Sequence, residues 1–237
     1  MQQPVEYGHP CRLYLISPPT VESAEAFAAA LSDALSGGDV GAFQLRLKDA
    51  SEELLRETAR ACQKVCAEHE VAFVLNDRPD IAFEIGADSV HMGQEDLEKT
   101  SLEEVRELVG PEIAIGVSCH DSSHLAMDAG DRGADYVAFG AFYETQSKAP
   151  EQLAKYGTPT VDILEWWSTY TVLPCVAIGG MTPDNCAPMV KAGADFIAAI
   201  TAVWSHPQGA KAGVTAMNKA IIQALKEKKL ADDASAA

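Results

Sequence analysis

The stretch VAFVLNDRPDIAFEIGADSVHMGQED, residues 71–96, predicts the unit from which the fold is built. It holds two short apolar segments, 71–75 and 89–92, which we expect to be strands. The residues between them have the apolar spacing of a helix, and Gly86 stands where a helix commonly ends. A strand, a helix and a second strand in this order predict two parallel strands joined by a crossover helix.

Each of these two strands ends in a polar cluster, NDR at 76–78 and QED at 94–96. Because consecutive parallel strands point the same way, the clusters should emerge side by side at one edge of the sheet. Asp77 and Asp96 could hold one divalent cation there, with Arg78 balancing or orienting them. Mg²⁺ is commonly held by one or two carboxylates together with waters and substrate phosphates. The alternative is that both aspartates only cap helices, but their placement at adjacent strand ends favours a metal site.

Composition limits what such a site could serve. The chain of 237 residues has no apolar run of transmembrane length, and its first residues, MQQPVEYGHP, lack the features of a signal peptide. A formal net charge of −17 argues against nucleic-acid binding. The six cysteines lie mostly inside predicted strands and helices, as small core residues do. We therefore expect a cytoplasmic protein with small-molecule substrates and neither a membrane nor a nucleic-acid partner.

The whole chain reads as eight strand–helix units. The predicted strands are 12–16, 42–47, 71–75, 89–92, 113–117, 136–139, 174–178 and 196–200. Helices are predicted between them, among them 23–35, 51–69, 101–109 with Ser101 and Glu104 in capping-box spacing, 161–169, 183–193 and 209–225. Residues 1–10 form an N-terminal extension in this interpretation, 11–226 form one domain, and 227–237 form a disordered tail.

Eight such units favour a closed (β/α)₈ barrel, the TIM barrel fold. Strands such as FVLN and FIAAI are apolar throughout, as parallel strands buried on both sides are. An open doubly wound sheet would also alternate strands and helices, but no GxGxxG follows the first strand. In the barrel, the groups of an active site lie at the carboxyl ends of the strands.

The end of the second predicted strand is unusually polar. Alternation along QLRLK places Gln44, Arg46 and Lys48 toward the barrel interior, and Leu45 and Leu47 toward the helices. A buried row of one amide and two cations is costly without an anionic or polar partner. Ion pairs with core carboxylates are one explanation, and an anionic substrate is the one we favour.

The residues at the remaining strand ends are mostly polar residues and glycines. They are Asn76, Asp77, His91, Gln94, Asp96, Ser118, Cys119, His120, Thr145, Ser147, Lys148, Gly179, Gly180, Ile200 and Thr201. Backbone N–H groups after the last two strands of a barrel commonly bind a phosphate. This inventory suits two phosphorylated groups, one of them a metal-bound diphosphate. We interpret His91, inside a strand, as a hydrogen-bonded core residue, and we leave the role of His120 open.

Six segments in this order and spacing resemble the thiamine-phosphate synthase family. They are QLRLK at 44–48, LNDRPDIAFEIGADSVHMGQEDL at 75–97, IGVSCH at 115–120, TQSK at 145–148, VAIGGM at 176–181 and IAAITAVW at 197–204. The resemblance implies a transferase on a (β/α)₈ barrel that uses Mg²⁺. It would join 4-amino-2-methyl-5-hydroxymethylpyrimidine diphosphate to 4-methyl-5-(2-phosphooxyethyl)thiazole, or to its carboxylated form, and release diphosphate.

The resemblance also implies a role for each matching position. The pyrimidine diphosphate would be contacted by Gln44, Arg46, Lys48, Asn76, Ser118 and Lys148, of which Lys48, Ser118 and Lys148 would take part in catalysis. Mg²⁺ would be bound by Asp77 and Asp96. The thiazole phosphate would be held by Thr145, Ser147, Gly179, Gly180, Ile200 and Thr201. The implied mechanism is dissociative, with diphosphate leaving before the thiazole nitrogen attacks.

The chain departs from the family pattern at several positions. Ala141 stands where the family usually has proline, and Ser89 where it usually has glycine. Thr201 replaces a serine and keeps the hydroxyl, and Met181 replaces the common isoleucine. None of these changes removes a charged or metal-binding group, but the first leaves the conformation of the loop after the sixth strand open.

Two other functions remain open at this stage. A thiazole tautomerase has the same barrel and relies on a histidine near this rim, which His120 could supply. A non-catalytic protein that binds thiamine phosphate and has a regulatory role is the second. Lys48, Asp77, Asp96 and Lys148 argue against the tautomerase, and the intact charge at every expected position argues against a loss of catalysis. Release of diphosphate that depends on Mg²⁺ and on both substrates would separate the three. The oligomeric state and the choice between carboxylated and plain thiazole phosphate stay open.

Overall fold

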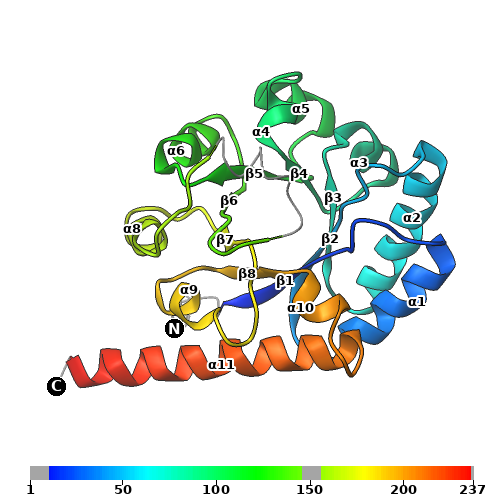
Figure 1. Ribbon diagram of the computed structural model, residues 1–237. Coiled ribbons are helices and arrows are strands. Elements are labelled where there is room, and N and C mark those ends of the chain that lie inside the picture. The colour runs from blue at the N-terminus through cyan, green and yellow to red at the C-terminus, as the bar shows by residue number, and fades with distance from the viewer. Residues whose placement is uncertain (1–10, 146–155, 236–237) are drawn as a thin grey trace, which may run out of the picture.

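Eight parallel strands close into a barrel in chain order, from β1 to β8. The structure is a computed structural model and describes residues 11–145 and 156–235. Figure 1 shows the helices arranged around the ring of strands. The (β/α)₈ barrel predicted from the sequence is confirmed, and the open-sheet alternative is wrong.

The strands lie close to their predicted positions. Their bounds are β1 (Arg12–Ile16), β2 (Val40–Leu45), β3 (Ala72–Asn76), β4 (Ser89–Met92), β5 (Ala114–His120), β6 (Tyr136–Phe139), β7 (Cys175–Ala177) and β8 (Phe196–Ala199). Strand β2 begins and ends two residues earlier than predicted, so Arg46 and Lys48 follow the strand instead of belonging to it. Arg46 is half-buried and Lys48 is exposed.

Capping residues mark the ends of several of the helices. Their bounds are α1 (Ala24–Leu35), α2 (Glu52–Glu68), α3 (Pro79–Ile85), α4 (Gln94–Leu97), α5 (Leu102–Val109), α6 (Ser123–Asp131), α8 (Asp162–Tyr170), α9 (Ala187–Lys191), α10 (Thr201–Trp204) and α11 (Ala210–Ser235). Ser51 caps α2, and Ser101 and Glu104 form the predicted capping box of α5. Gly86 ends α3 in the left-handed conformation, as its position predicts.

Two helices differ from the prediction. Helix α9 begins at Ala187 instead of residue 183, because Asn185 accepts a hydrogen bond from Thr182 N and forms a turn first. Helix α11 continues to Ser235, although composition predicts a disordered tail from residue 227. The added residues are mainly alanine, lysine, leucine and aspartate, with no glycine or proline to stop the helix. In Figure 1 this end of α11 extends past the barrel.

The core has two layers, because successive side chains of a strand point to opposite faces. Outward-facing residues such as Leu13, Leu15 and Phe43 pack between the strands and the helices and are fully buried. Inward-facing residues fill the interior of the barrel, and they are Tyr14, Ile16, Ala42, Val74, Ala138, Val176 and Ala198. No described helix is long and apolar enough to cross a membrane.

Glycine at position 116 makes room for a buried tyrosine inside the barrel. Gly116 of β5 pairs in register with Tyr136 of β6. A Cβ atom at position 116 would lie 2.0 Å from Tyr136 Cζ. The hydroxyl of Tyr136 lies 3.0 Å from that of Tyr14, so the ring cannot move without breaking this contact. The small residue and the large one are therefore a matched pair.

Replacing Gly116 with alanine should lower the free energy of unfolding by on the order of 2 kcal/mol, because overpacking forces buried atoms apart. The measurement is denaturant unfolding of both proteins. Gly130→Ala in α6 is the control, since its Cβ would meet only the end of the Leu173 side chain, at 3.3 Å. The control should be neutral or slightly stabilising. Equal stabilities of the two variants would contradict this account of position 116.

Candidate active site

Three adjoining cavities open at the carboxyl ends of the strands. The acidic cavity is lined by Arg46, Lys48, Asn76, Asp77, His91, Gly93, Gln94, Glu95, Asp96, Ser118, His120 and Tyr156. The central cavity is lined by Ile16, Gln44, Arg46, Asn76, His91, Ser118, His120, Ala138, Gly140, Ile178 and Ile200. The glycine cavity, of about 490 Å³, is lined by residues of 141–145, 178–182, 198–202 and 205–207. Residues shared between neighbouring cavities make them one continuous site.

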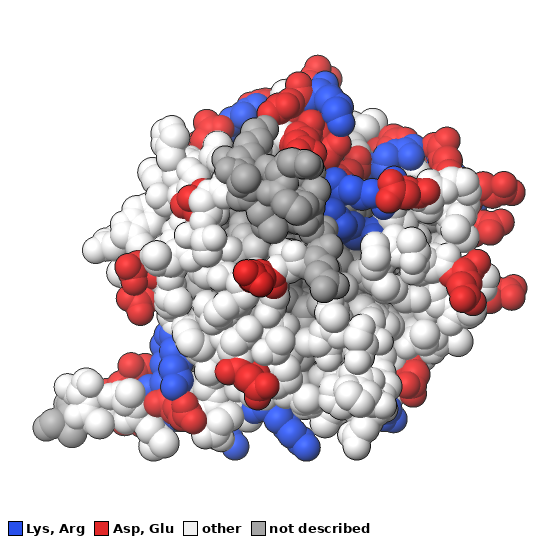
Figure 2. All heavy atoms as spheres, in the orientation of Figure 1, with Lys and Arg blue, Asp and Glu red and all other residues white. Residues whose placement is uncertain are grey.

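Charge is distributed unevenly over the face of the barrel seen in Figure 2. One group of Lys and Arg side chains lies to the upper right of the middle, over the region of β2 and β3, with Asp and Glu side chains directly beside it, and other Lys and Arg side chains lie along the upper and lower edges. In a chain with a net charge of −17, this concentration of cations is local. An anionic substrate would be attracted to this part of the surface.

A short chain of hydrogen bonds joins the ends of β2 and β3. Gln44 Nε2 donates to Asn76 Oδ1 at 2.6 Å, and Asn76 Nδ2 donates to Asp77 Oδ2 at 2.5 Å. Lys48 Nζ lies 3.3 Å from the same carboxylate oxygen. Sequence alternation correctly placed Gln44 inside the barrel, but it did not foresee that the Lys48 side chain is 42% exposed. Lys48 reaches the site from the loop after β2.

Asp77 bridges the ends of β3 and β4 from an unusual backbone conformation. Its φ is +59°, in the left-handed region, which costs an ordinary L-residue on the order of 1 kcal/mol. Asp77 N donates to His91 O at 2.9 Å, and Gly93 N donates to Asp77 Oδ1 at 3.2 Å. These two bonds tie the residue to β4 and set the direction of its carboxylate.

Asp96 approaches the same point from the other side. A Cβ atom at position 93 would lie 3.2 Å from Asp96 Oδ2 and 3.6 Å from Asp77 Oδ1. The absence of a side chain at Gly93 therefore keeps a space between the two carboxylates. Neither aspartate caps a helix, because Arg78 precedes α3 and Gly93 precedes α4, both without a side-chain capping bond. The capping interpretation of Asp77 and Asp96 is wrong.

This pair of carboxylates suits one type of metal ion. Among residues 11–145 and 156–235, no three His, Cys, Asp or Glu side chains are grouped to hold a metal. A closed zinc or calcium site needs more protein ligands than two. Mg²⁺ fits better, since it keeps several waters and takes the remaining ligands from substrate phosphates. Lys99 Nζ lies 3.2 Å from Asp96 Oδ1 at the exposed side.

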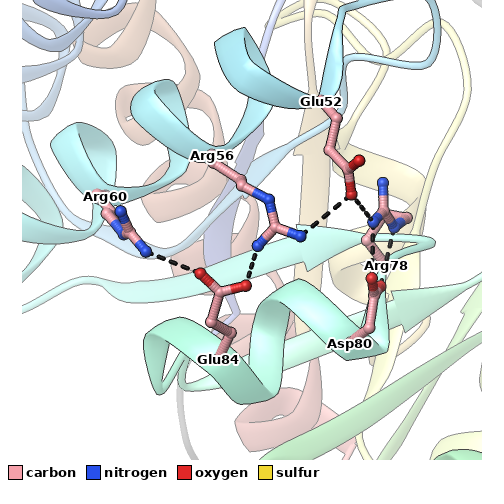
Figure 3. Close-up of polar contacts among 6 residues, drawn as sticks. All are labelled: Glu52, Arg56, Arg60, Arg78, Asp80 and Glu84. Carbon is pink, nitrogen blue, oxygen red and sulfur yellow. Dashed lines mark hydrogen bonds and ion pairs between the residues drawn. The ribbon is translucent and has the colours of Figure 1, made fainter.

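Arg78 does not contact either of these carboxylates. Its guanidinium donates to Asp80 through Nε and Nη2 and to Glu52 through Nη2 (Figure 3). These bonds, those to Asp80 first, raise the pKa of Arg78 above its ordinary value. The prediction that Arg78 balances Asp77 or Asp96 directly is wrong, because α3 begins immediately after it and the side chain turns toward α2.

A second polar chain runs through the interior of the barrel. His91 Nε2 lies 2.9 Å from Ser118 Oγ, and His91 Nδ1 lies 3.1 Å from the hydroxyl of Tyr136. Tyr136 in turn contacts Tyr14. His91 is 8% exposed and is the hydrogen-bonded residue that the sequence predicted, yet it also lines two of the cavities. This chain of hydrogen bonds orients the hydroxyl of Ser118 from the interior of the barrel.

Sequence reasoning missed the two tyrosines of this chain. Tyr14 and Tyr136 lie in β1 and β6, 122 residues apart, so no local pattern links them. Burial raises the pKa of Tyr136 to about 12. The one available signal was the small residue Gly116 in the strand next to Tyr136, because a glycine inside a strand often marks a close approach.

His120 is held by a stacking contact at the edge of the site. Its φ is +55°, and its ring stacks on that of Tyr156 with a centroid distance of 3.5 Å and an angle of 5°. The register between β5 and β6 shifts just before it, between Ser118 and His120. Gln94 Nε2 donates to Ser118 O at 2.6 Å and ties β4 to this irregular strand end.

The glycines after β7 accommodate another part of the chain. Gly179 and Gly180 have φ values of +106° and +63°. A Cβ atom at position 180 would lie 2.5 Å from Glu144 O, and one at position 179 would lie 2.4 Å from the Cβ of Ala141. The sequence assigned these glycines to a phosphate alone. In the structure, glycine is required at these two positions because residues 141–144 pack closely against them.

The loop after β6 continues the hydrogen-bond ladder of the barrel. Phe142 N donates to Ile178 O at 3.1 Å, and Tyr143 N donates to Gly179 O at 3.2 Å. The Gly140–Ala141 peptide bond is cis. Thr145 is the last described residue of this segment and lines the glycine cavity with Ile200 and Thr201. The predicted site residues Ser147 and Lys148 lie outside the described residues.

Comparison with known proteins identifies relatives over nearly the whole chain. A family model described as thiamine monophosphate synthase matches residues 13–203. The thiamine-phosphate synthase of Rhodospirillum centenum is 49% identical over 88% of this chain and 97% of its own length. That of Erythrobacter litoralis is 48% identical over 85% of this chain and 92% of its own. The structure of thiamine phosphate pyrophosphorylase from Pyrococcus furiosus matches with a TM-score of 0.77 and 27% identity, covering 92% of this chain and 98% of that one.

The buried Tyr136 predicts an alkaline limit to stability. The pKa of Tyr136 is about 12 in the folded protein and about 10 in an unfolded chain. Above pH 10 the unfolded state loses this proton first, so the stability from neutral Tyr136 is complete below pH 10 and declines as pH rises toward 12. Between these values the free energy of unfolding should fall more steeply in the wild type than in Tyr136→Phe, by up to about 1.4 kcal/mol per pH unit.

The measurement is denaturant unfolding of the wild type and of Tyr136→Phe at several pH values. Tyr170→Phe is the control, because Tyr170 is 72% exposed. The control should keep the wild-type slope. Equal slopes for the wild type and Tyr136→Phe would show that Tyr136 titrates in the ordinary range.

Proposed function

Because the chain belongs to the thiamine monophosphate synthase family, we propose that its three cavities hold the two substrates of that reaction. The chain is a transferase that makes thiamine phosphate. The acidic cavity would hold the diphosphate, the central cavity the pyrimidine ring and the glycine cavity the thiazole phosphate. The observation that carries this proposal is the convergence of Asp77 and Asp96 on the space at Gly93, beside Lys48.

The diphosphate end of the proposal rests on charge. Asp77 and Asp96 would hold Mg²⁺, which would neutralise the leaving diphosphate when bound. Lys48 and Arg46 line the same cavity and would bind the diphosphate oxygens directly. Lys48 contacts Asp77 in this structure, so its ammonium group is already at the site and the diphosphate would compete with Asp77 for it. Lys148 would supply a further cation, and it lies outside the described residues.

The pyrimidine end rests on directional hydrogen bonds. Gln44 and Asn76 hold one another, which fixes the orientation of both amides at the floor of the site. The Ser118 hydroxyl, held by His91, would bond the pyrimidine. Side chains fixed by their neighbours lose little entropy when a ligand binds.

The thiazole end rests mainly on backbone groups. Gly179, Gly180, Ile200 and Thr201 line the glycine cavity, and Thr145 completes it from the loop after β6. These residues, with Ser147 beyond the described part of that loop, would hold the thiazole phosphate. A phosphate bound in this way needs no arginine or lysine, because N–H groups and hydroxyls supply the donors.

The reaction requires no protein nucleophile. The bond between the pyrimidine methylene carbon and the diphosphate oxygen would break first, and diphosphate would leave with the bonding electrons. The thiazole nitrogen would then donate its lone pair to the resulting cation and form the new bond. The chain's own part is to place the two substrates in line and to stabilise the departing charge. A tautomerase or a simple binding protein would need neither Lys48 nor the carboxylate pair.

A cytoplasmic location is also part of the proposal. All six cysteines are buried free thiols, which suits a reducing compartment. Burial raises the pKa of Cys62 and Cys119 to about 12, so these thiols stay protonated and unreactive at neutral pH.

Asp77→Ala should abolish diphosphate release while the barrel stays folded, because half of the proposed metal site is lost. We expect turnover to fall by at least about a hundredfold, the scale of lost charge stabilisation in an active site. The measurement is diphosphate release with both substrates at varied Mg²⁺ concentrations, with circular dichroism to check folding. Asp128→Ala, which removes an exposed carboxylate on α6, is the control. Near-normal Mg²⁺-dependent activity of Asp77→Ala would refute the metal assignment.

Gly180→Val should raise the KM for thiazole phosphate by about tenfold, equal to about 1.4 kcal/mol, with little effect on the KM for pyrimidine diphosphate. The new side chain would push residues 143–144 out of place and distort the glycine cavity. Steady-state kinetics with each substrate varied would measure this. Gly86→Val carries the same backbone strain away from the site, with no neighbour within 4 Å, and should leave both KM values unchanged. Equal rises in the two KM values of Gly180→Val would indicate general damage to the barrel.

A further inference from the structure

An ion-pair network connects the start of α2 with the start of α3 (Figure 3). Arg78 Nη2 donates to Glu52 Oε1 at 2.7 Å. The same guanidinium makes a two-point contact with Asp80, from Nε to Oδ1 at 2.8 Å and from Nη2 to Oδ2 at 2.6 Å. Arg56 Nη2 donates to Glu52 at 3.1 Å. Arg78 is thus fixed by carboxylates on two different helices.

The network continues to a second bridging carboxylate further along the helices. Glu84 on α3 accepts hydrogen bonds from Arg56 and from Arg60, the latter at 2.8 Å. Glu52 and Glu84 are alike in that each carboxylate pairs with two arginines, Glu52 with Arg56 and Arg78, and Glu84 with Arg56 and Arg60. They differ in that only Glu52 contacts Arg78, and in that the pair of Glu52 with Arg56 lies within α2 whereas both pairs of Glu84 join the two helices.

Arg78 directly follows Asp77, one of the two proposed metal ligands. Asp77 has its left-handed φ of +59°, and the chain on either side of it is anchored. On one side Asn76 is bonded to Gln44, and on the other Arg78 is bonded to Glu52 and Asp80. A non-glycine residue keeps such a conformation only when its surroundings hold it there.

We propose that Arg78 is a positioning residue for Asp77, and that its bonds to Glu52 and Asp80 hold the Asp77 carboxylate where the transferase reaction uses it. The inference rests on the proposed role of Asp77 as a metal ligand. Glu52 begins α2 only four residues after Lys48, so the same bond also ties the loop carrying Lys48 to the loop carrying Asp77. Loss of this bond would free two groups of the acidic cavity together.

The test compares Glu52→Gln with Glu84→Gln. Each variant removes one negative charge and weakens two ion pairs with arginines, so the effect on net charge is matched. Glu84→Gln weakens two pairs between α2 and α3 and Glu52→Gln only one, so Glu84→Gln controls for any loss of helix docking. The first measurement is amide hydrogen exchange at Asp77 and Gly93 without metal or substrates. Asp77 N–H bonds to His91 O, and Gly93 N–H bonds to Asp77 Oδ1, so both amides report on the position of Asp77. The second is the Mg²⁺ concentration that gives half-maximal diphosphate release.

Glu52→Gln should speed exchange at both amides by about threefold and raise the required Mg²⁺ concentration by about threefold, a change of the size that exposed ion pairs produce. Glu84→Gln should change neither. Equal behaviour of the two variants in hydrogen exchange would overturn the proposal, and so would faster exchange in Glu52→Gln with an unchanged Mg²⁺ requirement.

Arg78→Lys provides an independent variant that keeps the positive charge. Lysine cannot make the forked contact with Asp80 together with the bond to Glu52, so it should act like Glu52→Gln. Arg60→Lys, which alters the single contact of Arg60 with Glu84, is its control and should behave like the wild type. If Arg78→Lys exchanges at the wild-type rate, Arg78 does not position Asp77.

Failure of the inference and failure of the proposed function give different results. Mg²⁺-dependent activity in Asp77→Ala would refute the metal assignment and with it this role of Arg78. Loss of that activity, together with equal hydrogen exchange in Glu52→Gln and Glu84→Gln, would leave the proposed function in place and refute the inference alone.

Discussion

The closure of eight parallel strands into one barrel determines where every group of the site lies. Parallel strands in a closed ring deliver their carboxyl ends to the same rim, so segments far apart in the chain meet there. Lys48 reaches Asp77 and His91 reaches Ser118 because of this geometry, across 29 and 27 residues of sequence respectively. The site is therefore a product of topology, with each strand supplying one or two groups.

Glycine and left-handed residues decide how closely these strand ends approach one another. Gly93 leaves the space between the two carboxylates, Gly180 admits the backbone of the neighbouring loop, and Gly116 admits the ring of Tyr136. Asp77 and His120 adopt positive φ values without being glycine. Such conformations cluster at functional sites. Asp77 and His120 both line the acidic cavity, while a third such residue, Glu70, lies in the turn before β3.

The interior of the barrel combines packing with orientation. Small inward side chains such as Ala42, Ala138 and Ala198 leave room for the chain from Tyr14 through Tyr136 and His91 to Ser118. A buried polar network of this kind is stable only when its members satisfy one another. The network that fills the interior of the barrel therefore also orients the Ser118 hydroxyl at the carboxyl ends of the strands.

Sequence patterns predict the eight strand–helix units, the barrel, the helix caps at Ser51 and Ser101, and the position of most polar groups at the strand ends. These follow from apolar periodicity and local capping chemistry, which act over a few residues. The packing of separate elements is what turns Arg78 toward Glu52 and Asp80, brings Tyr14 and Tyr136 together, and crowds Gly180 against Glu144. Side-chain partners from separate strands and helices depend on distances in space, and no local sequence pattern records them.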